Sequence, residues 1–281
     1  MPEEKGQPDK NNENITNVNK YENFLTSVEN RGSFCYNRKT NRVKYSSSGG
    51  YMGSRINVLD IDIDNFTAKE AMKQFVDSMQ SEPLSVIEMV TADSLMQMDD
   101  TPELKGGVCY FDLVLAGDTT ILESADITEK RCLREIQERT FLKMLFRYIN
   151  RHHKRVYLLV ESEEEGQEFL DFLEHNYRGA QIGGMAKVSA KDRADDMIVN
   201  AINGADIDCV ISAMSSPLQE DFVTKNRSIL NAYVWLGLGK KSIPLKQAGT
   251  VQSRFTQYVI KKVFRKEMER RKKVEPQSMQ M

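Results

Sequence analysis

Short apolar runs that alternate with longer amphipathic stretches constrain the fold of this chain more than any other feature. Five of these runs have the composition of strands that are buried on both faces of a parallel sheet; they are residues 86–90, 112–116, 156–160, 209–213 and 233–237. The stretches between them have helical periodicity, as in residues 67–79, 133–149 and 192–203. Strands that alternate with helices in this way predict an α/β fold with a mainly parallel sheet and flanking helices.

The chain opens and closes with segments of different composition. Residues 1–54 are rich in Asn, Lys, Glu, Ser and Gly and predict a flexible, disordered polar extension. Residues 56–63 alternate apolar and polar side chains, which predicts one half-exposed strand at the start of an α/β domain over residues 55–249. Residues 67–70 form a capping box, Thr-x-x-Glu, where the first helix of that domain begins.

Residues 250–281 predict a basic, amphipathic helical appendage. Between Lys240 and Lys273 there are twelve Lys or Arg residues and two Glu residues, and Phe255, Tyr258, Val259 and Val263 share one helical face. A segment of this kind can lie on an anionic membrane surface or bind phosphates, or it can be a solvated helix.

The overall composition limits which partners and which cellular compartment fit the chain. The chain has 39 basic and 41 acidic side chains, so its overall charge argues against nucleic acid as a partner. Its four cysteines are widely spaced without a Cys-x-x-Cys pair, which fits a reducing compartment and no zinc site. No apolar run approaches the roughly 18 residues that span a bilayer. We therefore expect a cytosolic chain, or one that a membrane holds only at its surface.

Polar residues follow two of the predicted strands. Asp118 comes after 112–116, at the edge of an open α/β sheet where ligands bind. Its carboxylate can be a general base for a substrate hydroxyl, or the N-cap of the next helix. Thr91 and Asp93 follow 86–90, where they fit either a ligand site or a turn.

Two other segments also bear on a site, and the first is the more informative. Ser216-Pro217-Leu218-Gln219-Glu220 follows run 209–213, and Gln219 offers both a donor and an acceptor there, although the segment also fits an ordinary helix start. Gly237-Leu238-Gly239 fits a phosphate loop or a simple turn. No Gly-x-Gly-x-x-Gly fingerprint or Walker loop follows the first strand, which argues against an ordinary dinucleotide or NTP enzyme.

Four stretches in order, between residues 56 and 249, resemble the WecG/TagA/CpsF family of bacterial glycosyltransferases, which implies a Rossmann-like fold. Residues 63–71 resemble the family's first strand and helix, and Val90-Thr91-Ala92-Asp93 its Thr-x-Asn segment. Residues 112–118 resemble its Asp-Leu-Val-Leu-Pro-Asp-Gly segment with the last pair inverted. Residues 216–220 are similar to Gly-x-Pro-Lys-Gln-Glu, the most specific of the four.

The resemblance implies transfer of a sugar, commonly N-acetylmannosamine, from a UDP-sugar to a polyprenyl-diphosphate-linked acceptor, with inversion and without a required metal or cofactor. It implies that Asp118 is the general base and Thr91 the active-site threonine. The basic C-terminal appendage would contact the inner face of the cell membrane, and a homo-oligomer is compatible with it. The residues implied to bind substrate are Asp93, Pro217, Gln219, Glu220, Gly237, Gly239 and Arg254.

The chain departs from the family pattern at ligand-facing positions. Gly117-Asp118 is inverted, and Glu161-Ser162 replaces a glycine pair after the middle strand. Ser242-Ile243 replaces a Phe-Asp pair, and Arg254 stands alone where the family has Arg-Ala-Pro. These changes fit an enzyme with a changed substrate. They fit equally a catalytically degenerate subunit that binds a nucleotide sugar or a partner. A nucleotide-responsive regulator is a third reading, which rests on fold analogy alone.

Overall fold

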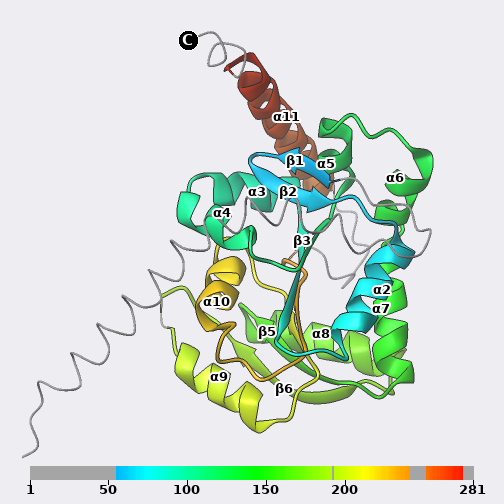
Figure 1. Ribbon diagram of the computed structural model, residues 1–281, viewed down its shortest axis with the longest axis vertical. Coiled ribbons are helices and arrows are strands. Elements are labelled where there is room, and N and C mark those ends of the chain that lie inside the picture. Colours follow the sequence, from blue (N-terminus) through cyan, green and yellow to red (C-terminus); the bar gives the residue numbers. More distant parts are fainter. Residues whose placement is uncertain (1–54, 192, 241–250, 275–281) are drawn as a thin grey trace, which may run out of the picture. The chain divides into compact units, whose positions relative to one another are not determined.

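In the part of the chain that the structure describes, a six-stranded parallel β-sheet lies between two layers of helices (Figure 1). The computed structural model describes residues 55–191, 193–240 and 251–274. Every neighbouring pair of strands in this sheet is parallel, so the prediction of an α/β fold is confirmed. In their order across the sheet, the strands are β4 (Leu113–Ala116), β3 (Ser85–Val90), β8 (Val234–Gly237), β7 (Cys209–Ser212), β5 (Arg155–Val160) and β6 (Gln181–Lys187).

Helices cover both faces of the sheet, and each face has its own apolar core. One face packs against α2 (Ala68–Ser78), α7 (Thr140–Arg151) and α8 (Glu163–Asn176). The other packs against α3 (Ala92–Asp99), α4 (Pro102–Val108), α9 (Asp195–Gly204) and α10 (Leu218–Asn226). Val86 and Ile87, neighbours in β3, are buried in opposite cores. Burial from both sides is the reason that the strands appear in the sequence as continuous apolar runs.

The first apolar stretch is a hairpin, so the prediction of one strand over residues 56–63 is wrong. β1 (Arg55–Val58) and β2 (Ile61–Asp64) pair antiparallel across a two-residue turn. Leu59 and Asp60 in that turn have φ angles of 51° and 65°. The usual signal for such a turn is Asn-Gly or Asp-Gly; here Asp60 is not followed by glycine, so the sequence lacks that signal. β2 lies beside β4, and Oδ2 of Asp64 accepts a hydrogen bond from Val114 N at 3.1 Å.

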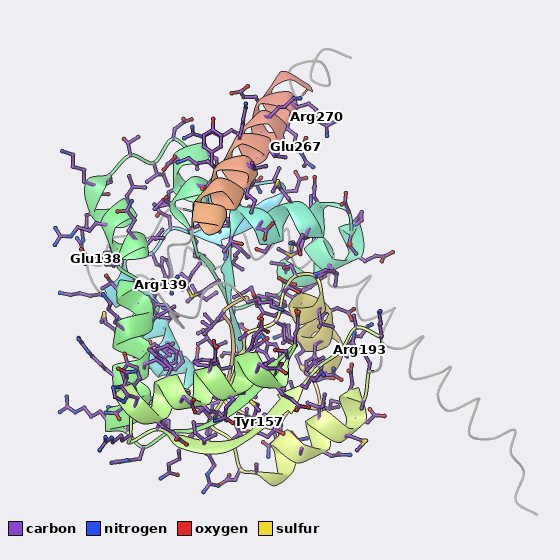
Figure 2. The ribbon with its side chains drawn as sticks, turned by 180° about the vertical axis from the view of Figure 1, so that it is seen from behind. Glu138, Arg139, Tyr157, Arg193, Glu267 and Arg270 are labelled. Carbon is purple, nitrogen blue, oxygen red and sulfur yellow. The ribbon has the colours of Figure 1, made fainter. Side chains whose placement is uncertain are left out.

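The predicted helix over residues 133–149 is divided in two. α6 (Lys130–Gln137) ends before α7 begins, because Arg139 between them has a left-handed backbone (φ 52°, ψ 44°). Figure 2 labels Glu138 and Arg139 at this junction. The sequence prediction also missed α3, α4 and strand β6, whereas α5 (Thr119–Ser124) is the helix expected after an N-cap at Asp118. β6 lies at the sheet edge and contains two glycines, which are depleted from strands, so it has no apolar run.

Side-chain caps fix where two of the helices, α2 and α8, begin. Thr67 accepts a hydrogen bond from Glu70 N at 3.3 Å, and Glu70 accepts one from Thr67 N at 2.8 Å, which confirms the capping box of α2. Ser162 caps α8 by accepting from Glu165 N at 3.2 Å. Both caps satisfy first-turn amides that have no partner within the helix.

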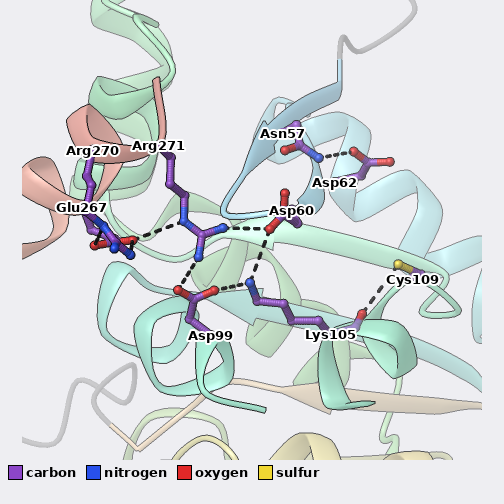
Figure 3. A network of polar contacts seen from close by, with 9 residues as sticks. All are labelled: Asn57, Asp60, Asp62, Asp99, Lys105, Cys109, Glu267, Arg270 and Arg271. Atoms are coloured by element: carbon purple, nitrogen blue, oxygen red, sulfur yellow. Dashed lines mark hydrogen bonds and ion pairs between the residues drawn. The ribbon is translucent and has the colours of Figure 1, made fainter. Parts of the chain in front are cut away.

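The predicted C-terminal helix is present as α11 (Val251–Val274). Phe264 on this helix is fully buried, and Lys261 Nζ lies 2.7 Å from a carboxylate oxygen of Glu123. Farther along the helix, Arg271 pairs with Asp60 at 2.7 Å and with Asp99 (Figure 3). Among the described residues, no helix is long and apolar enough to cross a membrane. The predicted extension over residues 1–54 lies outside the described residues.

Candidate functional site

The sheet brings two groups of predicted site residues to its carboxyl edge, because parallel strands all end on the same side. The first, here called the Thr91 group, follows β3 and β4; it consists of Thr91, Asp93 and Asp118. The second, here called the Gln219 group, follows β7 and β8; it consists of Pro217, Gln219, Glu220, Gly237 and Gly239. The side chain of Arg254 lies outside the described residues, so its role stays a prediction.

Asp118 joins the beginnings of two helices. Its Oδ1 accepts hydrogen bonds from Thr120 N at 2.9 Å and Ile121 N at 3.2 Å, which makes it the N-cap of α5. Its Oδ2 accepts from Ala92 N at 2.8 Å, in the first turn of α3. Burial raises the pKa of Asp118 even though these amides act to lower it. The capping role is therefore present, and it holds the carboxylate beside Thr91.

Gly117, the residue before Asp118, lets the chain pass close to the end of β3. Gly117 N donates to Val90 O at 2.6 Å, so the chain passes close to the end of β3. A Cβ atom at position 117 would lie 3.0 Å from the same carbonyl oxygen. Any side chain there would crowd β3, and the carboxylate is carried by the next residue instead.

Thr91 and Asp93 occupy the first turn of α3. Thr91 Oγ1 accepts from Ser94 N at 3.1 Å, and Ser94 Oγ accepts from Thr91 N at 2.8 Å. Thr91 is thus the N-cap of the helix, and Asp93 is half-buried two residues further on. The polar segment is a helix start at the carboxyl edge of the sheet, and its part in ligand binding stays a prediction.

Gln219 is a buried link between three strands. Only 1% of it is exposed, and its Oε1 accepts from Ser212 Oγ at 2.8 Å and from Gly239 N at 3.3 Å. Its Nε2 donates to the carboxyl of Glu88 in β3. Glu220, the next residue, is equally buried and accepts from the Ser216 hydroxyl. Gln219 and Glu220 are therefore buried beneath the carboxyl edge of the sheet, where their hydrogen bonds hold the strand exits.

Glu88 is a buried acid beneath this edge that the sequence prediction did not single out. It lies in β3, is fully buried, and faces Gly237 across the ladder to β8. Burial raises the pKa of Glu88 well above its ordinary value, and the nearby carboxyl of Glu220 raises it further, although Gln219 and Trp235 act to lower it. Burial likewise raises the pKa of Glu220. A charged residue inside the apolar run 86–90 was the signal that could have identified it.

A cavity of about 480 Å³ opens between the ends of β5 and β7. The helix after β5, α8, covers one face of the sheet, whereas α10, after β7, covers the other. Ligands bind in α/β sheets at such a reversal. The cavity is lined by residues from four segments: Leu104, Glu161, Val188, Ser189, Ala190, Arg193, Ser215, Ser216, Pro217, Leu218 and Asp221.

Charges at this cavity are largely paired within the protein. Arg193 binds Asp195 and Asp221 and lies 5.9 Å from the centre of the Phe222 ring, beside α10 (Figure 2).

Gly239, on the β8 side of the edge, has a φ of 71°, a conformation that favours glycine. Within the described ranges, no three His, Cys, Asp or Glu side chains are grouped so that they could hold a metal ion. Metal independence itself stays a prediction.

Comparison with known proteins gives one family. The sequence model described as "Glycosyl transferase WecG/TagA/CpsF family" matches residues 56–243, well over half of the chain. The match begins in the β1–β2 hairpin and takes in both site groups. No curated protein matches the chain.

Proposed function

Because the chain belongs to the WecG/TagA/CpsF family of glycosyltransferases, we propose that it transfers a sugar from a UDP-sugar to a polyprenyl-diphosphate-linked acceptor. In this proposal the donor carries a sugar similar to N-acetylmannosamine. The reaction inverts the configuration of the anomeric carbon and needs no metal ion. The observation that carries the proposal is the 2.8 Å hydrogen bond from Ala92 N to Asp118 Oδ2, which holds a half-buried carboxylate at the carboxyl edge of the sheet beside Thr91.

In the proposed reaction, Asp118 accepts the proton of the acceptor hydroxyl as that oxygen attacks the anomeric carbon of the donor. The bond between the anomeric carbon and the β-phosphate oxygen breaks, and UDP leaves with the electron pair. A base is more effective when its pKa approaches the working pH, and burial raises the pKa of Asp118. Donors at the cavity would stabilise the charge of the leaving diphosphate.

The exposed face of α11 supports a position on the inner face of the cell membrane. Tyr258, Val259 and Val263 are apolar and between 40% and 63% exposed. Lys262 and Lys266 are exposed at neighbouring positions of the same helix. Lys261, Arg265 and Arg271 instead pair with acidic groups of the α/β domain. Attraction to an anionic surface therefore rests on the outward residues.

The alternative function, a degenerate subunit that binds a nucleotide sugar or a partner, has its own support. Gln219 and Glu220 are buried. Asp118 already accepts hydrogen bonds from backbone amides at two helix starts. A protein with these features can keep the scaffold of the site while it lacks turnover.

A panel of UDP-sugars, tested by thermal unfolding of the full-length chain without divalent metal, examines the donor assignment. A ligand that binds only the folded state at about 100 times its Kd stabilises it by roughly 2.7 kcal/mol. We expect at least one UDP-sugar to do so, and the same donor to support transfer to a polyprenyl-diphosphate-linked acceptor. Stabilisation without transfer to any acceptor would favour the degenerate subunit. The absence of stabilisation by every UDP-sugar would reject the donor class.

A further inference from the structure

Glu161 receives an unusual set of hydrogen bonds for a glutamate at the end of a strand. It directly follows β5, and its Oε1 accepts from Ser215 N at 2.5 Å and from the Ser215 hydroxyl. Its Oε2 accepts from Lys240 Nζ at 3.2 Å. Three donors from the exits of two other strands, β7 and β8, thus converge on one carboxylate.

These donors are of the kinds that bind phosphate in nucleotide sites. A backbone amide, a hydroxyl and an ammonium group each give charge-assisted hydrogen bonds to an anion. Ser215 lies three residues before α10 begins at Leu218, so the amide end of that helix adds a positive field. Glu161 and Ser215 both line the cavity between β5 and β7, where a ligand has room.

The electrostatics indicate that Glu161 is ionised in this position. Burial alone would raise the pKa of Glu161, but the Ser215 hydroxyl and amide and the Lys240 ammonium together lower it below its ordinary value. Lys240 also pairs with Glu165 at 3.1 Å, so part of its charge is shared with a carboxylate outside the cavity. An incoming phosphate would face an anion that already holds the Ser215 donors.

We propose that Glu161 occupies a phosphate-binding site from within the chain, so that a diphosphate-containing ligand binds only when this carboxylate is displaced. The inference rests on the proposed function in its choice of ligand, because a UDP-sugar carries such a diphosphate. It adds a form of regulation to that function, because Glu161 lowers the affinity for the phosphate part of the donor. The Ser215 amide and hydroxyl and the Lys240 ammonium are the groups that the ligand would take over.

The test is calorimetric titration of the full-length chain with pyrophosphate, UDP and uridine. Glu161→Gly removes the occupant, and we expect it to bind pyrophosphate and UDP at least about tenfold more tightly than the unaltered chain. Uridine has no phosphate, so its binding should not change. Glu165→Gln is the matched control: it removes a carboxylate from Lys240 but leaves the Ser215 donors occupied, and it should gain little.

Glu161→Gln provides a second measurement if the glycine variant does not fold. It keeps the size of the side chain, removes the charge, and should also strengthen pyrophosphate binding. The inference is overturned if a folded Glu161 variant binds pyrophosphate no more tightly than the unaltered chain, or if Glu165→Gln gains as much. A gain for pyrophosphate in a chain that no UDP-sugar stabilises would support the anion site and reject the donor assignment. If a UDP-sugar stabilises the unaltered chain but the Glu161 variants gain no affinity for pyrophosphate, the donor assignment is supported and the anion site is overturned.

Discussion

The carboxyl group of Glu88 fills the space that a side chain on Gly237 would occupy. The two residues face each other in the ladder between β3 and β8, and a Cβ atom on Gly237 would lie 2.0 Å from Glu88 Oε2. A buried acid in the middle of a sheet therefore depends on a glycine in the neighbouring strand. The same acid accepts a hydrogen bond from Gln219, so the pair also sets the position of the β7 and β8 exits.

Gly237→Ala should destabilise the protein because the new methyl group overlaps the Glu88 carboxyl. Overpacking of this kind costs about 1–3 kcal/mol, measured as the free energy of unfolding in urea. Gly106→Ala is the matched control, since a Cβ atom at Gly106 meets nothing within 4 Å. In a Glu88→Ala background the cost of Gly237→Ala should shrink, because the overlapping group is gone. Equal costs in both backgrounds would refute the pairing.

Glu88→Gln should change how stability depends on pH. The pKa of Glu88 is raised in the folded state, so the folded chain keeps a proton that the unfolded chain releases above the ordinary glutamate value. The contribution of Glu88 is complete below that value and is lost as the pH rises toward the raised pKa, with a limiting slope of about 1.4 kcal/mol per pH unit. Urea unfolding from about pH 4.5 to about pH 8, an interval that begins near the ordinary glutamate pKa, should show the unaltered chain losing stability relative to Glu88→Gln. Glu174→Gln, at an exposed position, should run parallel to the unaltered chain, and a parallel result for Glu88→Gln would count against the raised pKa.

Asp118→Asn should separate the two roles of that carboxylate. Asparagine has one acceptor oxygen, so it cannot cap α5 and hold Ala92 N at once, and the loss should be about 1 kcal/mol of stability. If Asp118 is the base, transfer should also fall by roughly 10²–10⁴-fold while UDP-sugar binding persists. Thr67→Ala removes a cap from α2 without touching the proposed base, and should cost similar stability with transfer intact. Undiminished transfer by Asp118→Asn would move the role of base to Asp93.

Reversing charge on the outer face of α11 should weaken binding to anionic vesicles. Each basic residue near such a surface contributes on the order of 1 kcal/mol, so Lys262→Glu with Lys266→Glu should cause a salt-dependent loss of sedimentation with the vesicles. The matched control is Lys69→Glu with Lys73→Glu on α2, which has the same spacing and exposure. Removal of the whole helix is a poorer test, because it would uncover the contacts of Phe264. Equal sedimentation of the two double variants would contradict a membrane role for α11.

The sequence predicted the strands and helices that are buried on a regular period, and it missed those that are not. β3, β5, β7 and β8 are apolar because both of their faces are covered, and that requirement can be recognised without a structure. β6 has a free edge and two glycines, and the β1–β2 turn has no glycine, so neither carries a composition signal. The break at Arg139 requires a left-handed residue that a helical period does not reveal.

The sequence predicted where the candidate residues lie in the fold, but it did not predict their contacts. That Thr91, Asp118 and Gln219 meet one edge follows from the order of strands and helices. That Gln219 is buried depends on its hydrogen bond to Glu88, 131 positions away in the sequence. The contact between Glu161 and Ser215 spans 54 positions and also depends on which strands are neighbours. Strand order across a sheet is set by packing between distant segments, and a local pattern does not encode it.

The hydrogen bond from Val114 N to Asp64 closes one border of the sheet to further strands. A side chain of the β1–β2 hairpin already takes an amide that an incoming strand would need. In the described part of the chain, the six-stranded sheet has two borders, β4 and β6. With β4 closed, main-chain pairing could continue only at β6. A fibre grows only if each subunit offers one border to the preceding subunit and another to the next. Strand pairing between the β6 borders of two six-stranded sheets would therefore join two chains edge to edge and use up the open border of each sheet.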